Sequence, residues 1–175
     1  MLESLITSKT RIKLLLKFFI NPSTKAYLRE LAKEFDASTN SIRLELNRLE
    51  KSNLLISQMQ GRTVQYQANT KNTLFKDIRS IVLKYVGIDS LIENIISKLG
   101  DLRSAYIIGE YAHGMDTGII DVVLIGNIDK DILNRLVEKT EVLIHRKIKW
   151  LILREQEFKS LKDTLDISHA LKVWG

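Results

Sequence analysis

A helix pattern that runs directly into a hairpin pattern, at residues 38–68, constrains the fold of this chain more than any other feature. Ile42, Leu46 and Leu49 recur at intervals of four and three, which predicts one buried stripe on a helix. Two runs of strand-like alternation follow, and Gly61 between them supplies the permissive backbone that a hairpin turn needs. A helix beside a hairpin with Arg62 at its tip predicts a surface that binds another molecule.

The residues around this pattern predict where the helix begins and ends. Ser38 is a good N-cap, and Asn53 lies where a helix commonly ends in left-handed backbone. The face opposite the buried stripe is polar and basic apart from one leucine. It carries Thr39, Asn40, Arg43, Leu44 and Asn47.

Two further helices are predicted before this one. The first is capped by Thr7 or Ser8 and stops at Asn21, because a residue that precedes proline avoids the helical region. The second is capped by Ser23 or Thr24 and extends through residue 35.

The positive charge of the chain is concentrated in the part that holds the helix and the hairpin. Residues 1–70 hold eleven Lys or Arg against six Asp or Glu, whereas residues 71–175 hold sixteen against fifteen. A basic surface attracts polyanions because it neutralises phosphates and releases their counterions. A solvated basic surface without a ligand is the simpler alternative.

Residues 8–69 resemble the ArsR-type winged helix-turn-helix regulators. The matching features are Leu28-Arg29-Glu30-Leu31-Ala32, the helix from Ser38, and Gly61-Arg62-Thr63-Val64-Gln65-Tyr66. The resemblance implies that the third helix enters the major groove of double-stranded DNA, and that the protein is a homodimer. The contacts it implies with bases or phosphates are Thr39, Asn40, Arg43, Asn47, Arg48, Lys51 and Arg62.

Leu44 and Glu45 differ from the polar and basic residues that surround them on this surface. Leu44 either touches a thymine methyl or packs inside the protein, and Glu45 would be repelled by phosphate unless it is turned away. A winged helix that contacts proteins instead of DNA is the alternative to the whole interface.

The remainder of the chain alternates helix and strand patterns. A helix at residues 74–86 carries an apolar stripe, which forms either a dimer interface or ordinary core. A helix at 90–99 is followed by strands at 104–108, 119–125 and 148–153 and by helices at 130–144, 155–161 and 167–174. Asp129 caps the helix at 130–144. The fold class is therefore α+β, with one domain at residues 1–87 and a second, mixed α/β domain at residues 88–175.

Residues 102–153 resemble the minimal nucleotidyltransferase domain. The resemblance rests on Ile108-Gly109-Glu110-Tyr111-Ala112-His113-Gly114 and on Asp121-Val122-Val123-Leu124-Ile125. In that family a Gly-Ser turn cradles the triphosphate, an Ala-Arg-Gly step follows, and three acids hold magnesium. Gly109, Gly114 and Asp121 match that pattern.

The positions that carry the family's chemistry are changed in this chain. Glu110 stands at the Ser position, His113 at the Arg position and Val123 at the second acid, and the strand at 148–153 has no acid. A two-metal site needs several carboxylates that converge on one point. The resemblance therefore implies a degenerate nucleotide site, with Asp121 as a vestigial catalytic residue. An improvised site from Glu110, Asp116 and Asp121 is the alternative.

Composition narrows the remaining classes. The chain has no Cys, and its three His residues are scattered, so we expect neither a metal site nor a cofactor. No apolar run approaches the ~20 residues that span a bilayer, and Met1-Leu2-Glu3-Ser4 lacks the blocks of a secretion signal. We expect a cytoplasmic protein without a membrane partner.

These observations lead to one principal hypothesis and two alternatives. The principal one is a transcriptional regulator whose second domain serves as a sensor for a protein or small-molecule effector, as a partner module or as a dimerisation module. The first alternative is an active nucleotidyltransferase that modifies a protein or small molecule, with the winged helix as a docking module. The second is a protein that only binds other proteins.

Overall fold

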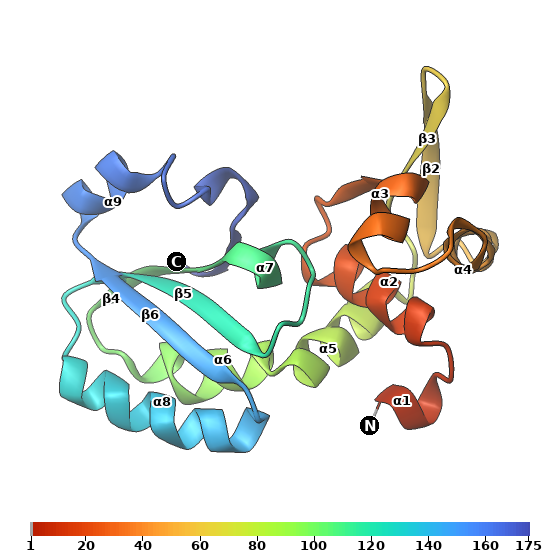
Figure 1. Cartoon of the computed structure of the whole chain (residues 1–175). Coiled ribbons are helices and arrows are strands. Elements are labelled where there is room, and N and C mark those ends of the chain that lie inside the picture. Colours follow the sequence, from red (N-terminus) through yellow and green to blue (C-terminus); the bar gives the residue numbers. More distant parts are fainter. Residues whose placement is uncertain (1) are drawn as a thin grey trace. The chain divides into compact units, whose positions relative to one another are not determined.

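The computed structural model describes residues 2–175 and has an α+β fold with two separate sheets (Figure 1). The chain divides into two compact units, one that ends at Val82 and one that begins at Leu83. The division lies within helix α5 (Phe75–Val86), whereas the sequence predicts a boundary after residue 87. Within residues 2–175, no helix combines the length and the apolar character needed to cross a membrane.

The first unit consists of helices packed on a small antiparallel sheet, with a hairpin that extends beyond the helices (Figure 1). Its sheet has the strand order β1-β3-β2. Its elements are α1 (Leu2–Leu5), α2 (Lys9–Ile20), β1 (Lys25–Tyr27), α3 (Leu28–Glu34), α4 (Thr39–Lys51), β2 (Leu55–Gln60) and β3 (Thr63–Ala68).

Local signals account for most of these boundaries. The Ser8 hydroxyl accepts a hydrogen bond from the Arg11 amide and caps α2, and Ser38 does the same for α4 through the Ser41 amide. Asn53 has the predicted left-handed backbone, and Gly61 has a positive φ in the β2–β3 turn. The predicted stripe of α4 is fully buried.

The predicted start of the second helix is wrong. Residues 25–27 form strand β1, and α3 begins only at Leu28. Ser23 is not its cap, because the Ser23 hydroxyl donates to Asn21 Oδ1 at 2.6 Å within the preceding turn. The strand forms because Ala26 pairs with Tyr66 of β3, a partner forty residues away that local propensity does not reveal.

The helix that follows the hairpin begins at Phe75, one residue later than predicted. Its apolar stripe is mixed in exposure. Val82 is buried, whereas Leu74 and Ile81 are 57% and 47% exposed. The predicted helix at 90–99 instead begins directly after Gly87, as α6 (Ile88–Asn94), and ends in a single 3₁₀ turn, Ile96–Lys98.

The second unit is built on a four-stranded sheet of order β6-β5-β4-β7. Strands β5 and β6 are parallel, and the other pairs are antiparallel. Helix α8, capped by Asp129 as predicted, connects β5 to β6. The elements are β4 (Leu102–Ile108), α7 (Gly109–Ala112), β5 (Ile119–Gly126), α8 (Lys130–Ile144), β6 (Lys147–Leu153), α9 (Glu155–Leu161) and β7 (Leu171–Trp174).

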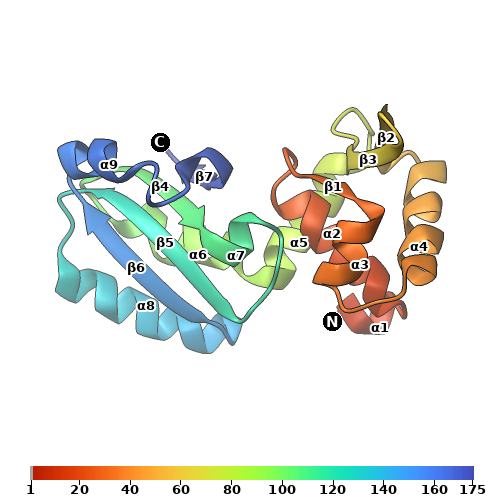
Figure 2. The same ribbon diagram turned by 45° about the horizontal axis from the view of Figure 1, so that its top comes forward.

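Both faces of this sheet are covered, α8 and α6 lying on one face and α9 on the other (Figure 2). On the α9 face, Val123 and Ile125 of β5 and Leu153 of β6 form a buried cluster with Phe158. The Phe158 ring also stacks on Tyr106, with ring centroids 5.3 Å apart. Successive residues of β5 therefore alternate between two apolar layers.

The predicted helix at residues 167–174 is wrong. The segment forms a 3₁₀ turn, Ile167–His169, and then strand β7, whose Leu171 pairs with Ile107 of β4. Half-buried and exposed residues alternate along Leu171–Trp174, which is the period of a strand. Pairing with β4 decides the outcome, and the partner strand is far away in the sequence.

Candidate nucleic-acid interface

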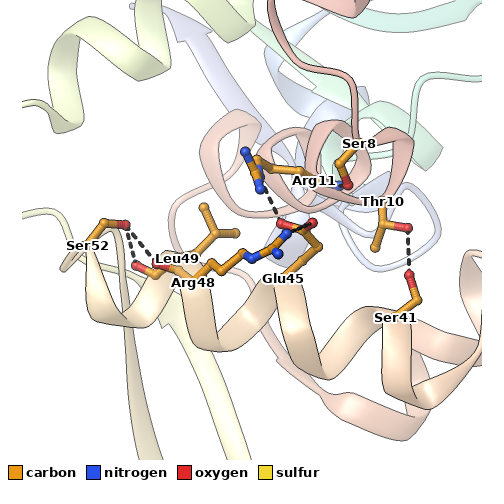
Figure 3. Close-up of polar contacts among 8 residues, drawn as sticks. All are labelled: Ser8, Thr10, Arg11, Ser41, Glu45, Arg48, Leu49 and Ser52. Carbon is orange, nitrogen blue, oxygen red and sulfur yellow. Dashed lines mark hydrogen bonds and ion pairs between the residues drawn. The ribbon is translucent and has the colours of Figure 1, made fainter.

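Helix α4 presents its polar face to solvent because its apolar stripe is anchored in the first unit. Near its N-terminus, the hydroxyls of Ser41 and Thr10 lie 3.2 Å apart and link α4 to α2 (Figure 3). All residues predicted to contact DNA from this helix are exposed. They are Thr39, Asn40, Arg43, Leu44, Asn47, Arg48 and Lys51.

A groove of about 510 Å³ lies beside this face, entirely within the first unit. Its walls come from α3, α4 and the hairpin. Three arginines line it, one from each of these elements: Arg29, Arg43 and Arg62. The other lining residues are Tyr27, Leu28, Asn47, Thr63, Val64 and Tyr66.

The three groove arginines have no internal counter-charge. Among residues 2–175, none of their guanidinium groups forms an ion pair or a side-chain hydrogen bond. Three positive groups around one concavity repel one another and attract an anion. Arg43 and Arg62 are predicted from the sequence, whereas Arg29 is not. It lies on the exposed side of α3, whose buried residues are Leu31 and Ala32.

Two tyrosines, Tyr27 and Tyr66, also line the groove. Gln65 Nε2 donates a 2.8 Å hydrogen bond to the Tyr27 hydroxyl and joins β3 to the start of α3. Burial raises the pKa of Tyr66, and the nearby Glu50 adds to this, whereas Arg43 opposes it. The Tyr66 phenol therefore stays neutral, and the positive charge of the groove comes from the arginines.

Glu45, which the sequence places near the groove edge, is turned away from it. Its carboxylate is buried between α4 and α2, where Arg11 Nε and Arg48 Nη1 donate to it at 2.8 and 2.9 Å (Figure 3). Arg48 keeps a side chain that is 62% exposed, but part of its charge is neutralised by Glu45. The expected repulsion of phosphate is therefore removed, and Arg48 differs from the groove arginines.

Replacing Glu45 with glutamine is expected to lower the free energy of unfolding of the first unit by about 1–3 kcal/mol at pH 7. Burial alone would raise the pKa of Glu45, but hydrogen bonds from Arg11 and Ser8 and the charges of Arg11 and Arg48 hold it below its ordinary value of 4.5. The stabilisation is therefore complete above pH 4.5 and is lost as the pH falls through the depressed value.

Urea unfolding followed by circular dichroism at pH 7 and near pH 3 measures both effects. Wild type and Glu45→Gln should differ less in their free energies of unfolding at the lower pH. Both tryptophans, Trp150 and Trp174, lie in the second unit, so their fluorescence serves as an internal reference that should not change. Glu50→Gln on the same helix is the matched control. An equal loss in Glu50→Gln would contradict the special role of Glu45.

In the second unit, Gly109 and Asp121, two residues of the degenerate nucleotide site that the sequence predicts, lie at one end of β4 and β5. Gly109 has a positive φ, and a Cβ there would lie 3.2 Å from Asp121 Oδ2, so the turn and the acid are adjacent. The neighbour of Asp121 on β6 is Lys149. Val123, at the position of the family's second acid, is in the buried cluster with Phe158.

The other members of that set lie on α7 and in the turn after it. The Glu110 side chain is exposed on α7, and Gly114 has left-handed backbone in the turn after it. His113 Nε2 lies 3.7 Å from Asp166 Oδ2, next to His169 in the C-terminal segment. Within residues 2–175, no three His, Cys, Asp or Glu side chains are grouped in a way that could hold a metal ion.

The Asp116 carboxylate takes part in internal hydrogen bonds rather than in an improvised site with Glu110 and Asp121. The Tyr111 hydroxyl donates to its carboxylate, and Arg146 Nε donates to Asp116 Oδ1 at 3.1 Å. The Gly118 amide donates to the same oxygen. Asp116 thus fastens the loop between α7 and β5 to the start of β6.

Comparisons with known proteins give a limited result. No family model matches the sequence, and no curated protein matches it. Reduced HlyU from Vibrio cholerae is a similar solved structure, with a TM-score of 0.38 and 17% identity over 47% of this chain and 82% of that chain. AF1382 from Archaeoglobus fulgidus has a TM-score of 0.39 and 14% identity, over 54% of this chain and 99% of that chain.

A mutant of the toxin–antitoxin complex MntA-HpeT is also similar, with a TM-score of 0.38 and 13% identity, over 50% of this chain and 71% of that chain. All of these scores and identities are low. The function is therefore inferred from the residues of this chain alone.

Proposed function

We propose that this chain is a transcriptional regulator whose first unit binds double-stranded DNA. The observation that carries the proposal is the groove with three uncompensated arginines beside the polar face of α4. The major groove of B-DNA, about 12 Å wide, admits one α-helix. With α4 in that groove, Arg29 and Arg43 reach the phosphates or base edges at its side, and Arg62 reaches the adjacent minor groove or backbone.

The first unit acts in this proposal as half of a homodimer. Two-fold symmetric proteins bind two half-sites about one helical turn apart, and each half-site receives one recognition helix. Leu74, which directly precedes α5, and Ile81 of α5 are exposed apolar side chains that a second copy would cover. The second unit, in which Asp121 stands beside Lys149, serves as a sensor, partner or dimerisation module.

Equilibrium binding of the full chain to duplexes selected from a random library tests the proposal. If each of two protomers neutralises about four phosphates, the slope of log K against log salt is about −7, and affinity falls about 10⁴-fold from 50 to 200 mM salt. Fluorescence anisotropy gives the affinity, and sedimentation gives the expected two chains per site. Binding that is equally tight to single strands of the same sequence, or that does not respond to salt, would contradict the proposal.

A further inference from the structure

One apolar side chain stands in the middle of the polar face of α4. Leu44 is 52% exposed, whereas the other leucines and the isoleucine of this helix are buried. Of the two readings that the sequence leaves open for Leu44, packing inside the first unit therefore does not account for it. A single exposed leucine is common on protein surfaces and needs a second observation before it indicates a ligand.

The neighbours of Leu44 supply that observation. Asn40 and Asn47 lie one helical turn before and after it on the same face, and among residues 2–175 neither side-chain amide has a hydrogen-bond partner. Arg43, whose guanidinium is also uncompensated, precedes it directly. Unused amides and cations around an apolar group fit a polar, anionic partner with one apolar spot better than they fit an apolar protein surface.

The major groove of DNA has one apolar group on its base edges, the C5-methyl of thymine. Asparagine is the side chain that pairs with two atoms of adenine in the same groove. We propose that Leu44 reads a 5-methyl pyrimidine, thymine in ordinary DNA, next to an adenine read by Asn40 or Asn47. This inference rests on the proposed function, because it names what the same surface recognises.

The spacing of these side chains limits where the thymine lies. Residues three or four apart on a helix have Cβ atoms about 5–6 Å apart. Stacked bases are about 3.4 Å apart along each strand. The methyl read by Leu44 and the adenine read by Asn40 or Asn47 therefore lie within about two base pairs of each other.

The test removes the methyl group from the DNA and its partner from the protein. Each thymine of the selected site is replaced singly by deoxyuridine, and the affinity of the full chain is measured by anisotropy. One thymine in each half-site should show an affinity about fourfold lower without its methyl group, the equivalent of one buried methylene. In Leu44→Ala the same replacement should have no effect.

Two controls separate this reading from its alternatives. Ile56→Ala removes an aliphatic side chain that is 50% exposed on β2, and it should keep the full response to deoxyuridine. Cytosine and 5-methylcytosine compared at the sensitive position should show the same preference for the methyl group. A methyl preference at thymine without one at cytosine would overturn the reading of 5-methyl pyrimidines as a class and would restrict the contact to the thymine of a T·A pair.

The remaining outcomes distinguish two failures. Salt-dependent binding without a methyl-sensitive position, or a methyl effect unchanged in Leu44→Ala, would overturn this inference and leave the proposed function intact. An absence of duplex binding would overturn both.

Discussion

Alanine at Arg29, Arg43 and Arg62 together is expected to lower the affinity of the full chain for duplex DNA by about 10²-fold or more, since three arginine contacts of at least roughly 1 kcal/mol each sum to about 3 kcal/mol per protomer. The slope of log K against log salt should become less steep by about 2.7 per protomer if all three contact phosphate. The effect is large because these guanidinium groups have no internal partner, so that each full charge is available to a ligand. Anisotropy over a salt series measures both quantities.

A second triple variant controls for net charge. Three exposed cations on α8 of the second unit, Lys130, Arg135 and Lys139, are replaced with alanine. This control removes the same number of positive charges. Affinity should change little in this control. An equal loss in both variants would show that the overall charge of the chain, and not the groove, accounts for binding.

Arg48→Ala provides a useful contrast within the same helix. Glu45 neutralises part of the Arg48 charge. Arg48→Ala should therefore weaken DNA binding less than Arg43→Ala does. The sequence places both residues on α4 and gives no reason to rank them. The ranking follows from the buried carboxylate between α2 and α4, which is visible only in the folded unit.

Local signals predicted the elements whose determinants lie within a few residues. Helix α4 follows from Ser38, its apolar stripe and Asn53, and α8 follows in the same way from Asp129. The hairpin follows from Gly61 and the alternation around it. These are cases in which the capping residue, the period and the turn agree.

The errors arose where a distant strand decides the conformation. Residues 25–27 and 171–174 become strands because β3 and β4 offer edges to pair with, and neither partner is near in sequence. The groove was missed because its three arginines come from three separate elements, α3, α4 and the hairpin, whose packing against one another the sequence does not reveal. A list of candidate residues was therefore attainable from the sequence, but their grouping into one concavity was not.

The same limit applies to the second unit. Its sequence singled out Asp121 and the changed positions around it, and the register of β5 on β6 adds that Lys149 is its neighbour. Two divalent cations need several acidic ligands, whereas the positions around Asp121 hold Lys149 and Val123. By contrast, the buried ion pair between Asp116 and Arg146 joins residues thirty positions apart, and the sequence gives no sign of it.

Asp116→Ala is expected to lower the free energy of unfolding of the second unit by about 2–4 kcal/mol, the upper part of the range being reached when a buried charge is left unpaired. Asp116 and Arg146 have side chains that are 17% and 15% exposed, so the loss leaves the Arg146 guanidinium poorly solvated. Arg146 then keeps the Ile144 carbonyl, the Tyr111 hydroxyl and the face of the Tyr85 ring as neutral partners, and no acidic one among the contacts described for it. Urea unfolding followed by tryptophan fluorescence reports on this unit alone, because both tryptophans lie in it.

The pH dependence of a second variant, Asp116→Asn, separates the ion pair from simple loss of volume. Burial alone would raise the pKa of Asp116, but hydrogen bonds from Arg146 and Tyr111 and the charge of Arg146 outweigh it and hold the pKa below its ordinary value of 3.8. The stabilisation is therefore complete above pH 3.8 and declines as the pH falls through the depressed value. Wild type and Asp116→Asn should thus converge in stability at low pH. Glu155→Ala breaks the exposed pair with Arg103 and should lower the free energy of unfolding by at most about 1 kcal/mol. A loss of stability as large as that in Asp116→Ala would mean that burial of the Asp116 pair has no special weight.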